Sequence, residues 1–262
     1  MLENYHTHTA RCRHATGTEE EYIQHAIDNG LKVLGFSDHT PVPFPGSYYS
    51  TMRMFPDQIG DYAQTILRLK EKYDGRLEIR LGLEVEYYPD RMADLLKLIK
   101  PHGIEYMILA QHWCGNEEGE PYNARPTEST QQLERYCNQS IEAMGTGLFS
   151  YMAHPDLLNF VGDPAAFRHH MTKLCQAAKT HQLPLEINFW GLRNQRNYPN
   201  EAFWQIAGEV GCQVVFGSDA HAPEYVTDSV TEAKALEIVR KYNLQLLEHI
   251  PIHPYTDSPL VR

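Results

Sequence analysis

Short apolar runs alternate with segments of helical periodicity along this chain, and this alternation is what most constrains its fold. The runs are rich in Val, Ile, Leu and aromatic residues, and they lack the strict alternation of a strand with one face in solvent. We therefore expect strands that are buried on both faces of a parallel sheet. The seven expected strands are residues 2–5, 32–36, 77–85, 106–110, 149–153, 185–189 and 212–216.

The intervals between these runs repeat apolar residues at the spacing of amphipathic helices. Two helix starts are marked, because Thr18 with Glu21 fits a capping box and Asp163-Pro164 fits an N-cap followed by proline at the first helical position. Alternation of strand and helix predicts right-handed βαβ units. Seven units without a break in composition favour one barrel-like α/β domain over residues 1–262.

Side chains that can bind metals lie at or just past the C-terminal end of six of the seven runs. In parallel α/β folds these strand ends converge on one face, and that face carries the active site. We therefore expect these residues to meet in one pocket. They are His6, His8, His14, His39, Glu84, His112, His154, Asp219 and His221.

Neutral imidazole and carboxylate groups suit Zn²⁺, Fe²⁺ or Mn²⁺. Residues two apart in a strand point the same way, so His6 and His8 can face one cavity, as can Asp219 and His221. So many ligands exceed the coordination shell of one ion, and we expect two or three divalent metal ions with one carboxylate bridging. Such a cluster can generate hydroxide near neutral pH and stabilise an in-line displacement. The other histidines, read as surface or packing residues, are His25, His102, His169, His170, His181, His249 and His253.

Composition excludes several classes of partner. The chain has 23 Lys+Arg against 34 Asp+Glu, a formal net charge of −11, which argues against a nucleic acid polymer. No stretch approaches the apolar length of a membrane span, and the N-terminus lacks the pattern of a secretory signal. Five scattered cysteines without a CxxC pair suggest reduced thiols in a cytoplasmic protein. The sequence does not reveal the oligomeric state.

The motifs resemble those of the PHP superfamily (polymerase and histidinol phosphatase), and in detail its histidinol-phosphate phosphatase branch. The resemblance extends from residue 6 to residue 221, nearly the whole chain. It rests on His6-Thr7-His8-Thr9 with His14-Ala15, Phe36-Ser37-Asp38-His39-Thr40-Pro41, Met52-Arg53-Met54, Gly82-Leu83-Glu84, His112, His154-Pro155 and Gly217-Ser218-Asp219-Ala220-His221.

The resemblance implies a distorted (β/α)₇ TIM-like barrel, the PHP fold, with a trinuclear metal site. It implies that His6, His8, Glu84 and Asp219 hold one metal. It implies that Glu84 bridges to a second metal on His112 and His154, and that His14, His39 and His221 hold a third. Glu86, two residues beyond Glu84, is the competing candidate for the bridge.

The resemblance also implies a metal-dependent phosphomonoesterase that converts L-histidinol phosphate to L-histidinol by attack of a metal-bridging hydroxide. Arg193 and Arg53 are the candidates for binding phosphate, because a guanidinium forks onto it; Arg196 and Arg13 are weaker candidates. The leaving alkoxide would take its proton from a metal-polarised water, Asp38 or His221. These three sources stay open.

Three rival functions also stay open. A PHP phosphoesterase could act on nucleotides or on another small phosphate ester. An amidohydrolase-type C–N hydrolase would usually need a metal-bridging Lys at a strand end, and none is evident. A non-enzymatic accessory module would need a longer chain or a partner surface. The bulky Phe189-Trp190 pair departs from the expected pattern of the phosphatase branch, and it bears on the choice of substrate rather than on the chemistry.

Overall fold

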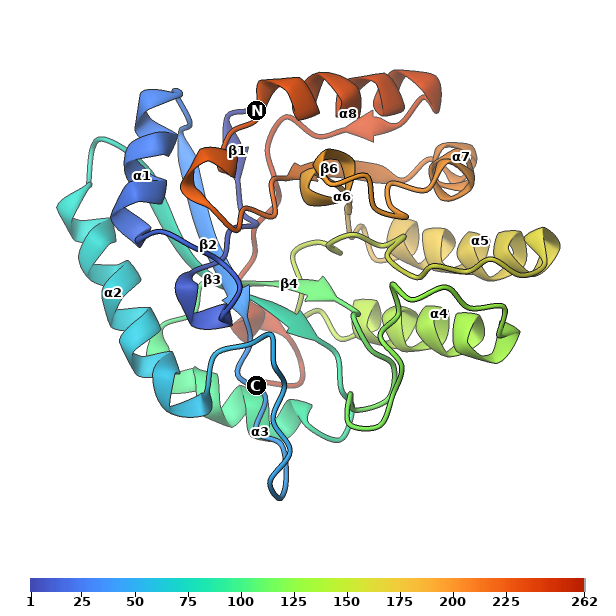
Figure 1. Cartoon of the computed structure of the whole chain (residues 1–262), viewed down its shortest axis with the longest axis horizontal. Helices are drawn as coiled ribbons and strands as arrows, with labels where there is room; N and C mark the ends of the chain where they lie inside the picture. Colours follow the sequence, from blue (N-terminus) through green and yellow to red (C-terminus); the bar gives the residue numbers. More distant parts are fainter. Residues whose placement is uncertain (262) are drawn as a thin grey trace.

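Two curved parallel sheets form the centre of the computed structural model, which describes residues 1–261 (Figure 1). The first sheet has the order β1-β2-β3-β4 and the second the order β5-β6-β7, and every pairing is parallel. Their strands are β1 (Glu3–Asn4), β2 (Val33–His39), β3 (Glu78–Glu86), β4 (Tyr106–Ala110), β5 (Leu185–Asn188), β6 (Gln213–Gly217) and β7 (Gln245–Leu246).

Single bridging residues join the two sheets at two seams. At one seam, Met152 pairs with Leu109 of β4 and with Leu185 of β5; at the other, Thr7 pairs with Ala220. The sheets therefore curl towards a closed barrel, which confirms the predicted TIM-like α/β fold.

Three details differ from the expected strands. Residues 149–153 form only the one-residue bridge at Met152, although they lie between β4 and β5 as predicted. The sixth strand ends at Asn188, because a short helix begins at Phe189. The strand β7 was not expected at all. It pairs with β6 over two residues, too short a segment to produce a periodic pattern.

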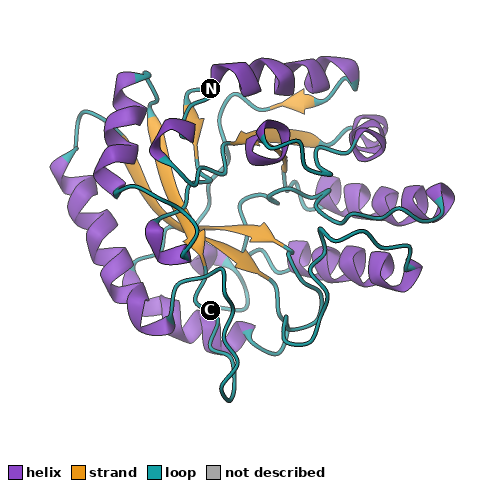
Figure 2. Ribbon diagram, viewed as in Figure 1, coloured by secondary structure: helices purple, strands orange, loops and turns teal. Residues whose placement is uncertain are grey.

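Helices cover the outside of the sheets, as Figure 2 shows in purple around the orange strands. Both expected N-caps are present: Thr18 and Glu21 form a capping box, and Asp163 accepts hydrogen bonds from the amides of Ala165 and Ala166. The α-helices are α1 (Glu19–Asp28), α2 (Ile59–Lys72), α3 (Met92–Ile99), α4 (Thr130–Gly145), α5 (Pro164–Thr180), α6 (Phe189–Arg193), α7 (Glu201–Val210) and α8 (Ser229–Lys241). The 3₁₀ turns are η1 (Ala10–Cys12), η2 (Pro56–Gln58), η3 (Lys100–His102), η4 (Pro223–Tyr225) and η5 (Tyr255–Asp257). Nowhere in residues 1–261 does a helix combine the length and the apolar character needed to cross a bilayer.

A small apolar cluster, which includes Tyr5, Tyr106 and Val215, is separate from the main core. The hydroxyl of Tyr106 donates to the backbone oxygen of Tyr5 at 2.8 Å, so this buried polar group is satisfied. A Cβ at Gly82 would lie 2.3 Å from the Tyr106 ring, so this close approach requires glycine. Gly82 lies two residues before Glu84 on β3, and the Tyr106 ring therefore packs directly beneath the region where the predicted metal ligands gather.

Candidate metal centre

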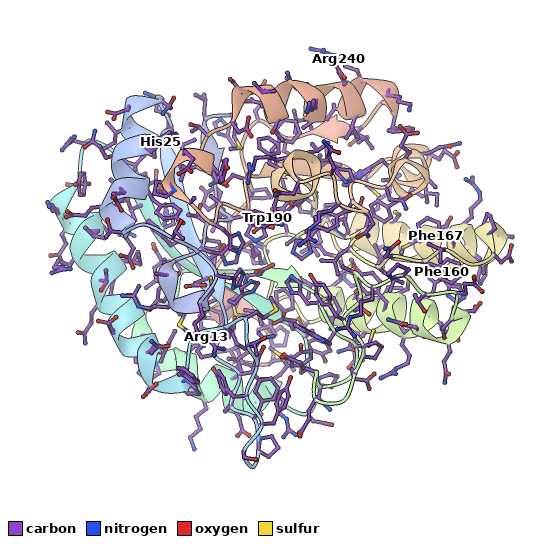
Figure 3. The ribbon with its side chains drawn as sticks, viewed as in Figure 1. Arg13, His25, Phe160, Phe167, Trp190 and Arg240 are labelled. Atoms are coloured by element: carbon purple, nitrogen blue, oxygen red, sulfur yellow. The ribbon has the colours of Figure 1, made fainter. Side chains whose placement is uncertain are left out.

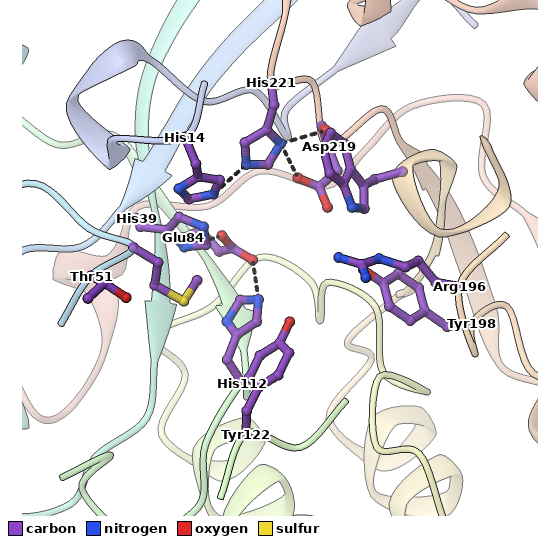
Figure 4. Close-up of a pocket in the computed structure, with 12 residues that line it drawn as sticks. His14, His39, Thr51, Glu84, His112, Tyr122, Arg196, Tyr198, Asp219 and His221 are labelled. Atoms are coloured by element: carbon purple, nitrogen blue, oxygen red, sulfur yellow. Dashed lines mark hydrogen bonds and ion pairs between the residues drawn. The ribbon is translucent and has the colours of Figure 1, made fainter. Parts of the chain in front are cut away.

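The nine predicted metal ligands come together at the C-terminal ends of the strands. Figure 4 shows the six of them that line the cavity: His14, His39, Glu84, His112, Asp219 and His221. His39 ends β2, Glu84 lies in β3, and His112 follows β4. The remaining ligands follow β1, Met152 and β6: they are His6, His8, His14, His154, Asp219 and His221. Residues that lie up to 215 positions apart, from His6 to His221, thus meet in one cluster.

Glu84 lies at the centre of this cluster and is 1% exposed. Its Oε1 is 2.9 Å from Nε2 of His154 and 3.4 Å from Nε2 of His6. Its Oε2 is 2.7 Å from Nδ1 of His39 and 3.6 Å from Nε2 of His8. Burial acts to raise the pKa of Glu84, but the surrounding imidazoles, with His39 and His6 foremost, hold it well below its usual value. Glu84 is therefore a carboxylate, and both of its oxygens face imidazole nitrogens.

Asp219 is the second carboxylate of the cluster. Its Oδ1 lies 3.0 Å from Nε2 of His8, 3.4 Å from Nδ1 of His221 and 3.5 Å from Nε2 of His6. Asp219 and His154 have positive φ angles, 48° and 28°, which non-glycine residues rarely adopt. Backbone conformations of this kind concentrate at functional sites, where the surrounding structure holds them in place.

A third group consists of His14, His39 and His221, whose ring nitrogens lie within 4.8 Å of one another. The Nε2 atoms of His14 and His221 are 2.9 Å apart. The Cys12 thiol, which is buried, lies within the same distance limit of His8 and His221 and was not expected at this site.

The donor atoms fit divalent metal ions. Several of them are buried and make no hydrogen bond of normal geometry within residues 1–261, although they lie close to one another; they are Nε2 of His6, Nε2 of His8, Nδ1 of His39, Oε2 of Glu84 and Oδ1 of Asp219. Each such atom would cost about 1–3 kcal/mol if it stayed unsatisfied. Imidazole nitrogens and carboxylate oxygens that face a shared space are the ligands expected for zinc, iron or manganese.

Three further carboxylates lie behind the histidines, and two of them, Glu186 and Glu86, form hydrogen bonds with the rings. Glu186 is 2.7 Å from Nδ1 of His6, and Glu86 is 2.8 Å from Nδ1 of His112. Asp38 is 3.5 Å from Nδ1 of His8. A carboxylate on one ring nitrogen fixes the tautomer and leaves the other nitrogen for the metal. Glu86 therefore does not take the place of Glu84 at the centre.

The sequence interpretation missed Glu186. It treated the sixth run as the one without chemistry, yet Glu186 is fully buried inside that run and also accepts a hydrogen bond from the amide of His154 at 3.0 Å. A lone acidic residue between the apolar Leu185 and Ile187 was the signal that could have revealed it.

The structure corrects the expectation for Asp38 as a proton donor. Asp38 is fully buried behind His8, where its carboxylate accepts hydrogen bonds from the amides of His39 at 2.8 Å and Thr9 at 3.3 Å. It lies behind a predicted ligand and does not line the pocket. His221 does line the pocket, but burial and neighbouring His8 hold its pKa well below the usual value. The neutral ring suits a metal ligand better than an acid.

Above the ligands lies a cavity of about 310 Å³. One side is made of the predicted ligands. The opposite wall is partly aromatic, and Figure 4 shows Arg196 and Tyr198 facing the ligands from across the cavity. The lining residues other than the predicted ligands are Thr51, Met52, Tyr122, Trp190, Arg196 and Tyr198, and Thr51 lies on the side of His39, across the cavity from Arg196. The departure noted at Trp190 therefore belongs to the pocket, where its ring centroid lies 4.6 Å from that of His221.

The four candidate arginines lie in different places. Arg196 is the one that lines the cavity. The structure corrects the expectation that Arg53 binds phosphate. Its side chain is fully buried in ion pairs with two glutamates and cannot reach a phosphate in the cavity. The same expectation is corrected for Arg193, which does not line the cavity. Its guanidinium carbon lies 3.9 Å from the Tyr225 ring centroid, and its Nη1 lies 3.4 Å from Asp228. Arg13 packs against aromatic rings of the loop that contains Tyr49.

We expect metal binding to release protons near neutral pH. Burial acts to lower the pKa of His8 in the metal-free protein, but Asp219, Asp38 and Glu84 together raise it to about 9. His8 is therefore protonated below that pH, and a metal needs its neutral ring. Apparent zinc affinity should rise as pH approaches 9.

Calorimetric titration of zinc in two buffers of different ionisation enthalpy measures these protons. His39 should contribute no proton to this release, in contrast to His8, because burial lowers its pKa to about 3 and its ring is already neutral. A zinc affinity that does not change with pH between neutrality and 9 would contradict the expectation.

Comparison with known proteins agrees with this geometry. The profile of the PHP domain matches residues 4–189. The chain is 32% identical over 246 residues to "Probable histidinol-phosphatase" of Deinococcus radiodurans, with 87% of this chain and 91% of that protein covered. It is 25% identical over 249 residues to "Histidinol-phosphatase" of Bacillus subtilis, with 82% and 92% covered.

Among solved structures, histidinol phosphate phosphatase from Lactococcus lactis, complexed with zinc, L-histidinol and phosphate, matches with a TM-score of 0.71. The sequence identity is 18%, and the match covers 97% of both chains, so this likeness establishes the fold. The resemblance read from the sequence is confirmed, and the chain belongs to the PHP domain family.

Proposed function

We propose that this protein is a metal-dependent phosphomonoesterase that hydrolyses L-histidinol phosphate to L-histidinol and phosphate. The observation that carries the proposal is Glu84, a buried carboxylate surrounded by imidazole nitrogens at the mouth of a barrel and open to a cavity of small-molecule size. The names of the relatives from Deinococcus radiodurans and Bacillus subtilis favour this substrate over other phosphate esters.

The residues fit two or three divalent ions. His6, His8, Glu84 and Asp219 would hold one ion, His112 and His154 a second that shares Glu84, and His14, His39 and His221 a third. Ions bound there supply Lewis acidity and an acidified water as nucleophile. The chain's own contribution is to hold the ligand rings in one tautomer, through Glu86 for His112 and Glu186 for His6.

Binding of the substrate would use the wall opposite the ligands. Arg196 presents a fork of N–H donors that can bind two phosphate oxygens and neutralise charge that develops on them. Tyr122, Trp190 and Tyr198 offer ring faces to the imidazole and ammonium groups of histidinol. Burial raises the pKa of Tyr122 to about 12, so its hydroxyl keeps its proton and can donate.

The test is phosphate release by the metal-loaded protein from L-histidinol phosphate, an aryl phosphate and a mononucleotide. We expect the highest kcat/KM with L-histidinol phosphate. A higher value with the mononucleotide would establish the alternative, a phosphoesterase of nucleotides. A protein that is fully loaded with metal and releases no phosphate from any of the three would refute the phosphomonoesterase itself.

Arg196→Ala is expected to lower kcat/KM for L-histidinol phosphate by about 10- to 100-fold, because a hydrogen bond to a charged group is worth about 1.5–3 kcal/mol. Arg196→Lys should recover part of this loss, since it keeps the charge without the fork. Arg240→Ala is the matched control, because Arg240 is exposed on α8 and lies at the outer surface in Figure 3. Equal activity of Arg196→Ala and the control would rule out phosphate binding by Arg196.

A further inference from the structure

Arg53 lies outside the pocket but forms the centre of a buried ionic network. Its side chain has no exposed surface. Its Nη1 donates to Oε2 of Glu86 at 2.6 Å and to the backbone oxygen of Thr40 at 3.2 Å, and its Nη2 donates to Oε2 of Glu117 at 2.5 Å. A buried charge persists only when it is paired and hydrogen-bonded. Here two carboxylates from different parts of the chain pair with one guanidinium.

One arm of the network leads to the metal centre. Oε2 of Glu86 accepts from Arg53, and Oε1 of the same carboxylate lies 2.8 Å from Nδ1 of His112. The other ring nitrogen of His112 faces Glu84 at 3.9 Å. Arg53 therefore fixes the carboxylate that in turn fixes the orientation of His112.

The second arm leads to the loop that forms one wall of the pocket, residues 41–55. Tyr48 of this loop donates to Oε1 of Glu117 at 3.1 Å, and Tyr88 donates to Oε2 at 3.0 Å. Arg53 itself belongs to the loop, and the residues just before it, Thr51 and Met52, line the pocket. The position of this wall thus depends on the same guanidinium.

We infer that Arg53 is a positioning residue that holds the pocket-wall loop and the metal ligand His112 in register with each other. It touches neither the substrate nor a metal, and it acts through Glu86 on one side and Glu117 on the other. The inference rests on the proposed function, because register between the wall and the metals matters only if a substrate lies between them. It also explains why arginine is needed here, since lysine cannot bind two carboxylates with separate nitrogens of a rigid fork.

Single substitutions separate the two arms. Glu86→Gln weakens the arm to His112 and leaves the loop contacts in place. Tyr48→Phe removes the loop contact to Glu117 and leaves His112 in place. Arg53→Lys weakens both arms. Arg80→Lys is the matched control, because Arg80 lies on the same strand as Glu86 but is half exposed in ion pairs with Glu78 and Glu105.

Two measurements report the two arms without depending on turnover. The first is the rate at which a chelator removes zinc from the loaded protein, followed with a zinc indicator. The second is the rate of limited cleavage by chymotrypsin in the loop, which contains Phe44, Tyr48 and Tyr49 as cleavage sites. Values of kcat and KM complete the set.

We expect Arg53→Lys to release zinc about tenfold faster, a loss typical of residues that support metal ligands, and also to be cleaved faster in the loop. Glu86→Gln should change only zinc release, and Tyr48→Phe only cleavage. Arg80→Lys should change neither. In Arg53→Lys, kcat should fall through His112 and KM should rise through the displaced wall.

The inference is overturned if Arg53→Lys matches Arg80→Lys in both rates, or if only one of its two rates changes. If Arg53→Lys does not fold, Arg53→Met with Glu117→Gln removes one positive and one negative charge together. We expect this double variant to fold and to show both defects. If the double variant releases zinc and is cleaved at wild-type rates, Arg53 only balances charge and the inference is overturned.

The proposed function and this inference can fail separately. A wild-type protein that binds zinc but hydrolyses no monoester would refute the function, while zinc release and cleavage would still test the network. An active wild type with unchanged rates in Arg53→Lys would refute the inference alone. A wild-type protein that binds no zinc, iron or manganese would refute both.

Discussion

Replacement of Glu84 by glutamine is expected to lower kcat/KM for phosphate release by more than about 100-fold, beyond the loss seen when a group that only supports a ligand is removed. Glutamine keeps the shape of the side chain but removes the negative charge. Glu84 places both oxygens against imidazole nitrogens, 2.7 Å from His39 and 2.9 Å from His154 at the closest. Within residues 1–261, Glu84 is the carboxylate of the cluster with imidazole nitrogens at both of its oxygens, whereas Asp219 faces them through Oδ1 alone.

The measurement needs to separate lost chemistry from lost structure. Circular dichroism and thermal unfolding of the metal-loaded variant test the fold, and elemental analysis counts the ions. Glu78→Gln is the matched control, because Glu78 begins the same strand and its side chain is 47% exposed. Activity in Glu84→Gln within tenfold of this control would contradict the central role of Glu84.

Removal of the metals should abolish activity and also destabilise the fold. The cluster buries several polar atoms that have no hydrogen-bond partner within residues 1–261, so without a cation their burial opposes folding. At a free metal concentration 1,000 times Kd, each ion adds about 4 kcal/mol to the free energy of unfolding. For a chain of this size each kcal/mol corresponds to a change in Tm of about 2–4 °C.

Scanning calorimetry before and after chelation, with elemental analysis, checks this expectation. Zinc, manganese or iron should restore both Tm and activity. Calcium is the control that should restore neither, because it prefers oxygen ligands and this site is rich in imidazole. Activity that survives complete removal of the metals would refute the metal centre as the source of catalysis.

The clustering of the candidate metal ligands could be predicted because the ends of buried strands can be recognised in the sequence. His39, Glu84 and His112 each end or follow a buried apolar run, and parallel strands bring such ends to one face. The prediction that these residues meet therefore does not depend on the order of the strands in the sheet. For the same reason the parallel sheet and the two helix N-caps were predictable, since local periodicity and capping encode them.

Residues whose role depends on a distant partner were not predictable in this way. Glu186 supports His6 across 180 positions, and its location inside an apolar run gave no strand-end signal. Arg53 was expected to bind phosphate because a guanidinium suits it, but two buried glutamates occupy it instead. Arg193 and Arg196 lie three residues apart, and only the packing of Arg193 against Tyr225 shows which of them turns away from the pocket.

The two seams of the barrel place the candidate metal centre where it could also hold the two sheets together. Thr7 pairs with Ala220 at one seam and Met152 bridges the other, and both seams lie beside predicted ligands. His6, His8 and Glu84 belong to the half with β1–β4, whereas Asp219 and His221 follow β6 in the half with β5–β7. His154 follows Met152, the bridging residue at the seam. Cations held between these residues would crosslink the two halves at the seams, where the fewest backbone pairs connect the sheets. The residues proposed to carry the chemistry would then also stabilise the association of the two sheets. A change of metal would alter the rigidity of the barrel together with its reactivity.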